Sequence, residues 1–362
     1  MASRTLWIGT YPPAGIGTPS GQGEGIHRAE IDLASGRLTV PEPVVETPAP
    51  SFLALHPDVG VLYAVDEDKA GQVTAFRVHD EVLEPLGTVP SGGEHPCHLL
   101  VDGALLYVAN YGDGALGVLP LAPDGSFAAP APQVLPGSGS GPDPERQRGP
   151  HAHFVARAPG GHVLVVDLGA DRIRRYARVP GGLEPAGTAA RLPAGTGPRH
   201  LAFEGWFSSG DEQDGGRFAY VTGELDATVR VLAWDPATDT GTVVQTLPAT
   251  KARATAAPVG ARAAWPASTA PSPSHLALAG SDLVVGVRGV GTLSRFAVGA
   301  DRLLTHRGDQ PLPGPTPRHF AVVGGWTVVA EQVPGAVSVL GRDGSVVSSY
   351  EVPSAACVLP AR

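Results

Sequence analysis

The chain has 362 residues, of which 42% are apolar and 17% charged, so it can bury a core and is not disordered by composition. A formal net charge of −9 without any Lys/Arg-rich cluster argues against a nucleic-acid or membrane-surface partner, and two cysteines are too few for a disulfide framework or a zinc cluster. The 48 glycines and 37 prolines are spread between short apolar runs, which is typical of many strands joined by tight turns.

The N-terminus leads from Met1-Ala2-Ser3-Arg4 directly into a strand-like run at 5–11. It lacks the apolar segment and the small-residue cleavage site of a signal peptide. The sequence also has no run of about 18 apolar residues that could span a bilayer. We therefore expect a cytoplasmic protein.

The first two units of the chain suggest how the strands are grouped. Runs at 6–11, 26–31 and 37–40 are strand candidates in the first unit. The second unit is more complete, with four strand candidates at 52–55, 61–65, 73–78 and 83–89 separated by short polar turns. Four antiparallel strands in a unit of about 40–50 residues correspond to one blade of a β-propeller.

A short motif, usually a proline followed by an aromatic residue and an apolar run, marks the start of each unit. Copies occur at 50–53, 96–99, 149–156, 198–201, 273–276 and 317–320, with a degenerate copy at 354–358. Because the N-terminal unit lacks a first strand and no unit follows the last copy, we expect the C-terminal strand to pair with the N-terminal blade and close the ring.

The predicted fold class is therefore all-β: a seven-bladed β-propeller with four antiparallel strands per blade. We expect it to form a single domain over residues 1–362. Segments at about 206–217 and 251–272 interrupt the repeat and are predicted to be surface insertions.

Histidines recur at the start of the first strands, which line the central channel of a propeller. Five of them should form one converging ring around the channel: His98, His153, His200, His275 and His319. For His98, His275 and His319 we favour a structural role, in which the ring nitrogens bond the backbone of the neighbouring blade.

Three residues depart from this repeated pattern. His151 is an additional imidazole found in one copy only, and Arg199 and Arg318 replace the Cys or Ser of other copies. A long cation that projects into a channel is costly to bury unless it meets an anion. For this group, the sequence pattern supports a functional role and a structural role equally.

The ends of the second strands carry polar residues that approach the same mouth of the channel: Glu67, Asn110, Glu224, Arg288 and Glu331. A carboxylate that faces an arginine-rich channel would be held ionised by its cationic neighbours. For Glu67, Asn110 and Glu331 we favour a role in capping strand ends or bonding adjacent loops.

Five segments, in order along essentially the whole chain, carry a family resemblance: Ile8-Gly9-Thr10-Tyr11, Leu62-Tyr63-Ala64-Val65-Asp66-Glu67, Val108-Ala109-Asn110-Tyr111-Gly112, Gly149-Pro150-His151-Ala152-His153 and Gly197-Pro198-Arg199-His200. Together they resemble the seven-bladed propeller lactonase family, whose members include cycloisomerase-type 6-phosphogluconolactonases and carboxy-muconate lactonizing enzymes. By this resemblance the active-site residues fall on His151, Arg199, Glu224 and Arg288. We further expect substrate contacts from His153, His200 and Arg318.

The resemblance implies hydrolysis of a sugar lactone, either 6-phosphogluconolactone or a related aldonolactone. Arg199 and Arg288 would hold the anionic group of the substrate and offset charge on the carbonyl oxygen, while Glu224 or His151 would take the proton from the attacking water. There is no G-x-S-x-G nucleophile motif, and His151-x-His153 alone is a weak metal signal, so we expect no acyl-enzyme, metal or cofactor.

Two alternatives remain open. The same residues could protonate an unsaturated diacid, as in a muconate-type lactonizing enzyme. The propeller could also be a binding platform without chemistry. For the lactonase we expect a small anionic or sugar lactone as the partner, with no nucleic acid and no membrane. We also expect a monomer, because a closed ring leaves no sheet edge that requires a partner.

Overall fold

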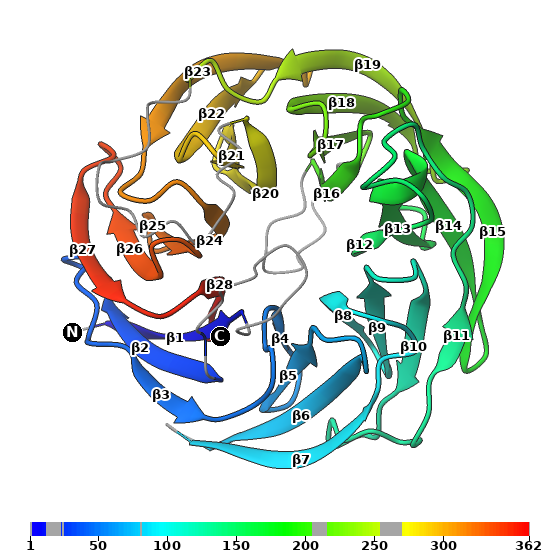
Figure 1. The fold of residues 1–362 in the computed structure, drawn as a ribbon, viewed down its shortest axis with the longest axis horizontal. Helices are drawn as coiled ribbons and strands as arrows, with labels where there is room; N and C mark the ends of the chain where they lie inside the picture. The colour runs from blue at the N-terminus through cyan, green and yellow to red at the C-terminus, as the bar shows by residue number, and fades with distance from the viewer. Residues whose placement is uncertain are drawn as a thin grey trace.

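The computed structural model describes residues 2–11, 23, 25–79, 82–204, 216–253 and 270–361. Within them, seven four-stranded sheets stand as blades around an axis, and the predicted seven-bladed propeller is confirmed (Figure 1). Most of the insertions predicted at about 206–217 and 251–272 lies outside the described residues. The second insertion ends before residue 272, because Ser272 is the first residue of a strand. The described part of the chain contains no helix that is long and apolar enough to span a bilayer.

Each blade consists of four consecutive strands, except that the first blade takes its innermost strand from the C-terminus. Blades 1 to 3 contain β28 (Ala355–Pro360), β1 (Ser3–Thr10), β2 (Ile26–Asp32), β3 (Glu42–Val45); β4 (Leu53–Leu55), β5 (Val61–Asp66), β6 (Gln72–His79), β7 (Val82–Pro90); β8 (Pro96–Asp102), β9 (Leu105–Asn110), β10 (Leu116–Pro120), β11 (Gln133–Leu135). Blades 4 and 5 contain β12 (Ala152–Arg157), β13 (Val163–Asp167), β14 (Arg172–Val179), β15 (Gly182–Arg191); β16 (Pro198–Phe203), β17 (Phe218–Gly223), β18 (Thr228–Asp235), β19 (Thr240–Pro248), with the 3-10 turn η1 (Leu168–Ala170) after β13. Blades 6 and 7 contain β20 (Ser272–Ala279), β21 (Asp282–Arg288), β22 (Thr292–Val298), β23 (Leu304–Pro311); β24 (Pro317–Val323), β25 (Trp326–Glu331), β26 (Ala336–Leu340), β27 (Val346–Glu351).

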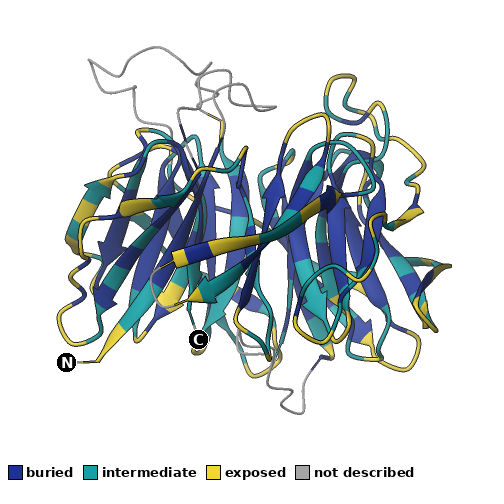
Figure 2. Ribbon diagram, turned by 90° about the horizontal axis from the view of Figure 1, so that it is seen from below, coloured by how far each residue is buried: buried dark blue, intermediate teal, exposed yellow. Residues whose placement is uncertain are grey.

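The inner strands are more buried than the outer strands. In Figure 2 the buried residues are dark blue and the exposed residues are yellow. The second strands β5 and β13 are buried at every residue, whereas the outer strands β19 and β27 are exposed or half-exposed along their length. A second strand packs against a neighbouring blade on both faces, so its sequence reads as a continuous apolar run. An outer strand faces solvent and carries alternating polar residues.

The core is divided into layers between adjacent blades. One cluster joins residues of blades 2 and 3, including Val61, Tyr63 and Leu106, and another joins blades 4 and 5. Each blade is therefore held mainly by burial of apolar area against its two neighbours, at roughly 25 cal/mol per Å².

The ring closes where the two ends of the chain meet. β28 pairs antiparallel with β1, with Trp7 opposite Leu359 and Ile8 opposite Val358. A shared apolar cluster of blades 1 and 7 packs beneath this junction. The predicted closure of the propeller by its C-terminal strand is thus confirmed.

The fourth strand of blade 1 differs from the sequence prediction. Residues 37–40 form only an isolated bridge, between Leu38 and Ile31, and the outer strand is β3 at Glu42–Val45. Pro43 is compatible with β3, because this strand lies at the edge of its sheet, where proline is tolerated.

Candidate functional site

Six first strands share one register, and this register decides which side chains face the channel. The following residues lie opposite each other on the first and second strands: Ala355 and Thr10, Pro96 and Asn110, Ala152 and Asp167, Pro198 and Gly223, Pro273 and Val287, and Pro317 and Glu331. Blade 2 follows the same plan, since Glu67 N bonds Ala49 O as Glu224 N bonds Gly197 O.

Three sets of equivalent residues follow from this register. The residue after the paired position on each first strand is called the mouth position: Ala356, Ser51, Cys97, His153, Arg199, Ser274 and Arg318. The next residue is called the plug position: Cys357, Phe52, His98, Phe154, His200, His275 and His319. The residue after the paired position on each second strand is called the rim position: Tyr11, Glu67, Tyr111, Leu168, Glu224, Arg288 and Gln332.

Six rings at the plug positions form a closed belt of aromatic contacts, with ring centroids 3.9–5.8 Å apart: Phe52, His98, Phe154, His200, His275 and His319. The predicted convergence of the histidines is therefore confirmed, with one correction. His153 does not belong to this belt, because Ala152 takes the paired position that proline holds in other blades and Phe154 becomes the ring residue.

Two plug histidines have the structural role that the sequence suggested. Nδ1 of His98 accepts the backbone N–H of Val155, and Nδ1 of His319 accepts that of Val358, each at 3.3 Å from the next blade. Burial lowers the pKa of His98 well below its usual 6.5 and that of His319 to about 3. Both rings are therefore neutral at physiological pH.

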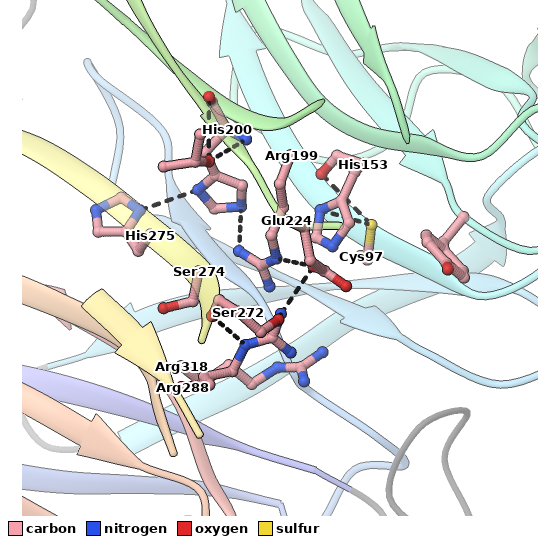
Figure 3. Close-up of polar contacts among 12 residues, drawn as sticks. Cys97, His153, Arg199, His200, Glu224, Ser272, Ser274, His275, Arg288 and Arg318 are labelled. Atoms are coloured by element: carbon pink, nitrogen blue, oxygen red, sulfur yellow. Dashed lines mark hydrogen bonds and ion pairs between the residues drawn. The ribbon is translucent and has the colours of Figure 1, made fainter. Parts of the chain in front are cut away.

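His275 departs from this pattern and bonds another imidazole. Nη1 of Arg199 lies 3.0 Å from Nε2 of His200, and Nδ1 of His200 lies 3.0 Å from Nδ1 of His275 (Figure 3). A guanidinium can only donate hydrogen bonds, so Nε2 of His200 accepts and its proton is on Nδ1. His275 then accepts at Nδ1, which places its own proton on Nε2.

Glu224 is the centre of the polar cluster in the mouth. Its Oε2 lies 2.9 Å from Nε of Arg199 and 2.8 Å from Nη2 of Arg288, and its Oε1 lies 2.7 Å from Nη2 of Arg146. In Figure 3 the side chains of Arg199 and Arg288 reach the carboxylate from two different strands. Three of the residues expected in the active site are therefore in direct contact.

The charges around Glu224 fix its protonation. Burial alone would raise the pKa of the Glu224 carboxyl, but Arg288, Arg146 and Arg199 together hold this pKa well below its ordinary value. Burial and the nearby Arg288 lower the pKa of Arg199 to about 9, so its guanidinium stays charged at neutral pH. Glu224 is thus a permanent anion that organises three cations.

Arg146 was missed by the sequence analysis. It lies in the loop between β11 and β12, where the carboxylate of Asp143 accepts the backbone N–H of Arg146 at 2.9 Å. Its neighbour Gln147 is fully buried and anchors the loop by bonds from Nε2 to the Leu168 carbonyl and to Asp171, each 2.9 Å. The sequence feature that could have identified Arg146 is a cation five residues before His151, in a segment without strand periodicity.

His151 lies against the same cluster through Tyr111. The two rings are stacked with centroids 4.6 Å apart, and Nδ1 of His151 lies 2.6 Å from the carbonyl oxygen of Tyr111. A carbonyl only accepts, so Nδ1 carries the proton and a neutral His151 has its lone pair on Nε2. The Tyr111 hydroxyl in turn accepts a bond from Nη2 of Arg146 at 2.9 Å.

The backbone beneath His151 is closely packed. A Cβ added to Gly169 of η1 would lie 2.0 Å from the carbonyl oxygen of Gly149 and 2.8 Å from Cδ2 of His151. The backbone N–H of His151 also donates to Oδ1 of Asp167 at 2.8 Å. The position of this imidazole is therefore set by η1 and the end of β13.

A second group of residues surrounds Glu67 on the other side of the channel. Glu67 accepts bonds from Tyr11 and Ser51, and Arg318 lies beside it. A small cavity lies between the two groups, lined by Ser51, Phe52, Glu67, Cys97, His153, Arg199, His200, Arg318, His319 and Ala356. The three residues expected to contact substrate, His153, His200 and Arg318, all line this cavity.

Glu67 was expected to cap a strand end or to bond adjacent loops, and it does bond Tyr11 after β1 and Ser51 before β4, but it also lies in the mouth beside Arg318. The expectation holds for the other two residues. Asn110 bonds Ser91 and the backbone of its own blade, and Glu331 accepts bonds from the Gly314 backbone and from Ser338. Among the residues that the structure describes, no three His, Cys, Asp or Glu side chains are grouped so that they could hold a metal ion.

A closed seven-bladed propeller with an arginine-rich mouth above a belt of aromatic rings defines the class of this protein. The sequence profile described as "Lactonase, 7-bladed beta-propeller" matches residues 5–360. The chain belongs to the seven-bladed β-propeller lactonase family, and the family resemblance drawn from its motifs is confirmed.

Two curated relatives are 31% identical to this chain over the aligned residues. A 6-phosphogluconolactonase of Bacillus subtilis is 31% identical over 236 residues, which cover 64% of this chain and 62% of that protein. A 6-phosphogluconolactonase of Serratia proteamaculans is 31% identical over 201 residues, 54% of each chain. The chain thus matches less than two thirds of the length of these relatives.

Solved structures match over the whole length. A periplasmic gluconolactonase of Pseudomonas aeruginosa is 29% identical with a TM-score of 0.83, covering 100% of this chain and 99% of that one. A protein of Lactobacillus plantarum is 27% identical with a TM-score of 0.83 and full coverage of both chains. Since one similar protein is periplasmic, the cytoplasmic location stays a prediction.

Proposed function

We propose that this protein hydrolyses lactones of sugar acids, with 6-phosphogluconolactone or a related aldonolactone as its substrate. The observation that carries the proposal is the convergence of Arg146, Arg199 and Arg288 on the buried carboxylate of Glu224. Membership of the lactonase propeller family and the names of the relatives support the same reaction.

In this proposal His151 is the general base. Its Nε2 holds the lone pair, because Nδ1 is committed to the Tyr111 carbonyl. Glu224 is unsuited to the role, since a carboxylate whose pKa lies well below the ordinary value accepts a proton poorly. A positioned base typically contributes ~10²–10⁴ in rate.

The chemical step begins when water attacks the lactone carbonyl carbon and gives its proton to Nε2 of His151. Negative charge then develops on the carbonyl oxygen, where Arg288 and Arg146 offer N–H donors that are already oriented by Glu224. As the intermediate collapses, the bond from the carbonyl carbon to the ring oxygen breaks. The ring oxygen takes the proton back from His151, and the open hydroxy acid is released.

Below this site the plug keeps the rest of the channel apolar and neutral. The imidazoles at its floor have pKa values lowered by burial, so they neither compete for the proton nor add charge. The low-polarity floor strengthens the electrostatic interactions of the arginines above it.

The proposal is tested with purified protein and a panel of sugar lactones, each measured against its spontaneous hydrolysis in the presence of a chelator. Enzymatic opening of 6-phosphogluconolactone or an aldonolactone supports the proposal. Turnover of a muconate-type diacid without lactone opening would instead favour the lactonizing reaction. If no compound is consumed, the protein is a binding platform.

A further inference from the structure

The mouth of the channel has two polar walls, and the proposed chemistry uses only one of them. The wall around Glu224 is built from blades 3 to 6, whereas blades 7, 1 and 2 supply Arg318, Tyr11 and Glu67. Arg318 places Cζ 4.3 Å from the centre of the Tyr11 ring, and its Nη2 lies 3.9 Å from Oε1 of Glu67. The second wall therefore also holds a cation, stacked and fixed in place.

The two walls hold their arginines differently. On the first wall, each oxygen of Glu224 lies within 2.9 Å of a guanidinium nitrogen. On the second, Glu67 accepts hydrogen bonds from the hydroxyls of Tyr11 (2.5 Å) and Ser51, and its nearest arginine nitrogen is 3.9 Å away. Glu67 therefore lies farther from its arginine than Glu224 does, although it still helps to raise the pKa of Arg318.

The repeat itself identifies what is unusual on the second wall. Blade 5 carries Arg199 at its mouth position and Glu224 at its rim position, so the two charges cancel within one blade. Blade 7 carries Arg318 and Gln332 at the same two positions, and Nη1 of Arg318 donates to Oε1 of Gln332 at 3.1 Å. An amide thus stands where a carboxylate would cancel the charge of Arg318.

Gln332 itself has unused hydrogen-bonding capacity. Its side chain is buried, with 5% exposed, and within the described part of the chain its Nε2 has no hydrogen-bond partner. A buried amide donor without a partner costs about 1–3 kcal/mol. Arg318 and Gln332 together therefore present N–H donors that suit a group with acceptor oxygens.

The balance of charge at the mouth points to the same kind of group. Among the residues that the structure describes there, Arg146, Arg199, Arg288 and Arg318 face the two carboxylates of Glu224 and Glu67, an excess of two positive charges. Arg318 is close enough to lower the pKa values of both Arg199 and Arg288. The cavity between the walls is lined by Arg199 and Arg318, so a bound anion would relieve this repulsion.

We propose that Arg318 and Gln332 form a second subsite, which binds an anionic oxygen-bearing group of the substrate, a phosphate or a carboxylate, while the lactone ring lies at the Glu224 wall. This inference rests on the proposed function and adds a residue pair that discriminates charged lactones from neutral ones. The group must be anionic, because a neutral hydroxyl would leave the excess charge uncompensated.

The decisive variant is Gln332→Glu, which gives blade 7 the same arginine and glutamate pair as blade 5. Its kcat/KM for 6-phosphogluconolactone should fall on the order of 10-fold to 100-fold through KM, while its kcat/KM for glucono-lactone without a phosphate changes less than about 3-fold. Gln332→Met, which has a similar shape but no charge and no N–H, should give a smaller loss on the same substrate. Equal losses on both lactones, or no loss on either, would overturn the subsite.

A binding measurement separates failure of the subsite from failure of the proposed function. Calorimetric titration of 6-phosphogluconate, glucarate and gluconate into the wild-type protein and Gln332→Glu needs no turnover. Weaker binding of 6-phosphogluconate alone by the variant assigns the subsite to phosphate, and weaker binding of glucarate alone assigns it to carboxylate, even if no lactone is hydrolysed. If lactones are hydrolysed but the variant binds all three acids as the wild type does, the subsite is wrong and the proposed function stands.

Discussion

Arg199 is held between an anion and a neutral imidazole, with Glu224 at its Nε and His200 at its Nη1. The carboxylate fixes the charge of the guanidinium, and the imidazole fixes its orientation. Since the plug is a continuous belt of rings, the position of Arg199 depends on packing around the whole channel as well as on its own blade.

Replacing His200 with Phe should lower kcat for lactone opening about 10-fold to 100-fold, because Arg199 loses a charge-assisted hydrogen bond at Nη1. Phenylalanine fills the same position in blades 2 and 4, so the belt of rings is kept. Steady-state kinetics measure the effect. The matched control is His98→Phe, which removes an imidazole that bonds only backbone, and equal losses in the two variants would contradict this role of His200.

Acid should destabilise the fold as the pH falls below about 6.5. Burial lowers the pKa values of His98, His200, His275 and His319 below the usual 6.5 in the folded protein, so the unfolded chain binds protons that the folded protein does not. The contribution of these rings to stability is complete above pH 6.5 and is lost toward the folded-state pKa values, with a slope of up to about 1.4 kcal/mol per pH unit for each ring.

Urea unfolding at pH 7.5, 6 and 5 measures this dependence. The variant His98→Phe should lose less stability between pH 7.5 and 5 than the wild-type protein, because one buried titrating ring is gone. An unchanged pH dependence in the variant would show that the plug histidines do not determine the acid sensitivity.

The ring of histidines illustrates which features of the fold could be predicted from the sequence and which could not. The blade count followed from the copies of the first-strand motif, and the ring closure followed from the absence of a first strand in the N-terminal unit. Which histidine faces the channel could not be read from spacing. In blade 4 the register with β13 moves Phe154 into the belt and His153 into the mouth, and a single residue of register changes the direction of a side chain.

The cluster around Glu224 was predicted only where strands supply its members. Glu224 directly follows β17, Arg288 ends β21, and Arg199 is the second residue of β16, so the repeat placed all three at the same mouth. Arg146 comes from a loop whose path depends on the buried bonds of Gln147, and no periodicity reports such a path. Two partners of Glu67, Tyr11 and Arg318, were also unpredictable, because they come from blades 1 and 7, at opposite ends of the sequence.

Glycine 169 offers a test of how His151 is positioned. The variant Gly169→Ala should lower kcat about 10-fold or more, because its Cβ would collide with the Gly149 carbonyl and force His151 to move. Kinetics and a thermal melt distinguish displacement of the imidazole from general unfolding. Gly308→Ala, where a Cβ meets nothing within 4 Å, is the control and should behave as the wild type.

Replacing Glu224 with Gln separates an organising anion from a general base. Without the carboxylate, Arg146, Arg199 and Arg288 repel one another, and kcat should fall roughly 10²-fold to 10³-fold. Since burial and three cations leave the pKa of Glu224 well below its ordinary value, its ionisation does not change across neutral pH. An acid limb of the kcat profile should therefore persist in the variant, and its loss would assign the base to Glu224.

The central claim is that His151 activates the water that opens a lactone. The most direct measurement is the initial rate of 6-phosphogluconolactone hydrolysis by His151→Phe, corrected for spontaneous opening. Phenylalanine can stack on Tyr111 as the imidazole does, so the fold and the arginine cluster should remain intact. The account predicts a fall of ~10²–10⁴ in kcat with unchanged circular dichroism, and a folded variant that keeps wild-type turnover would contradict it.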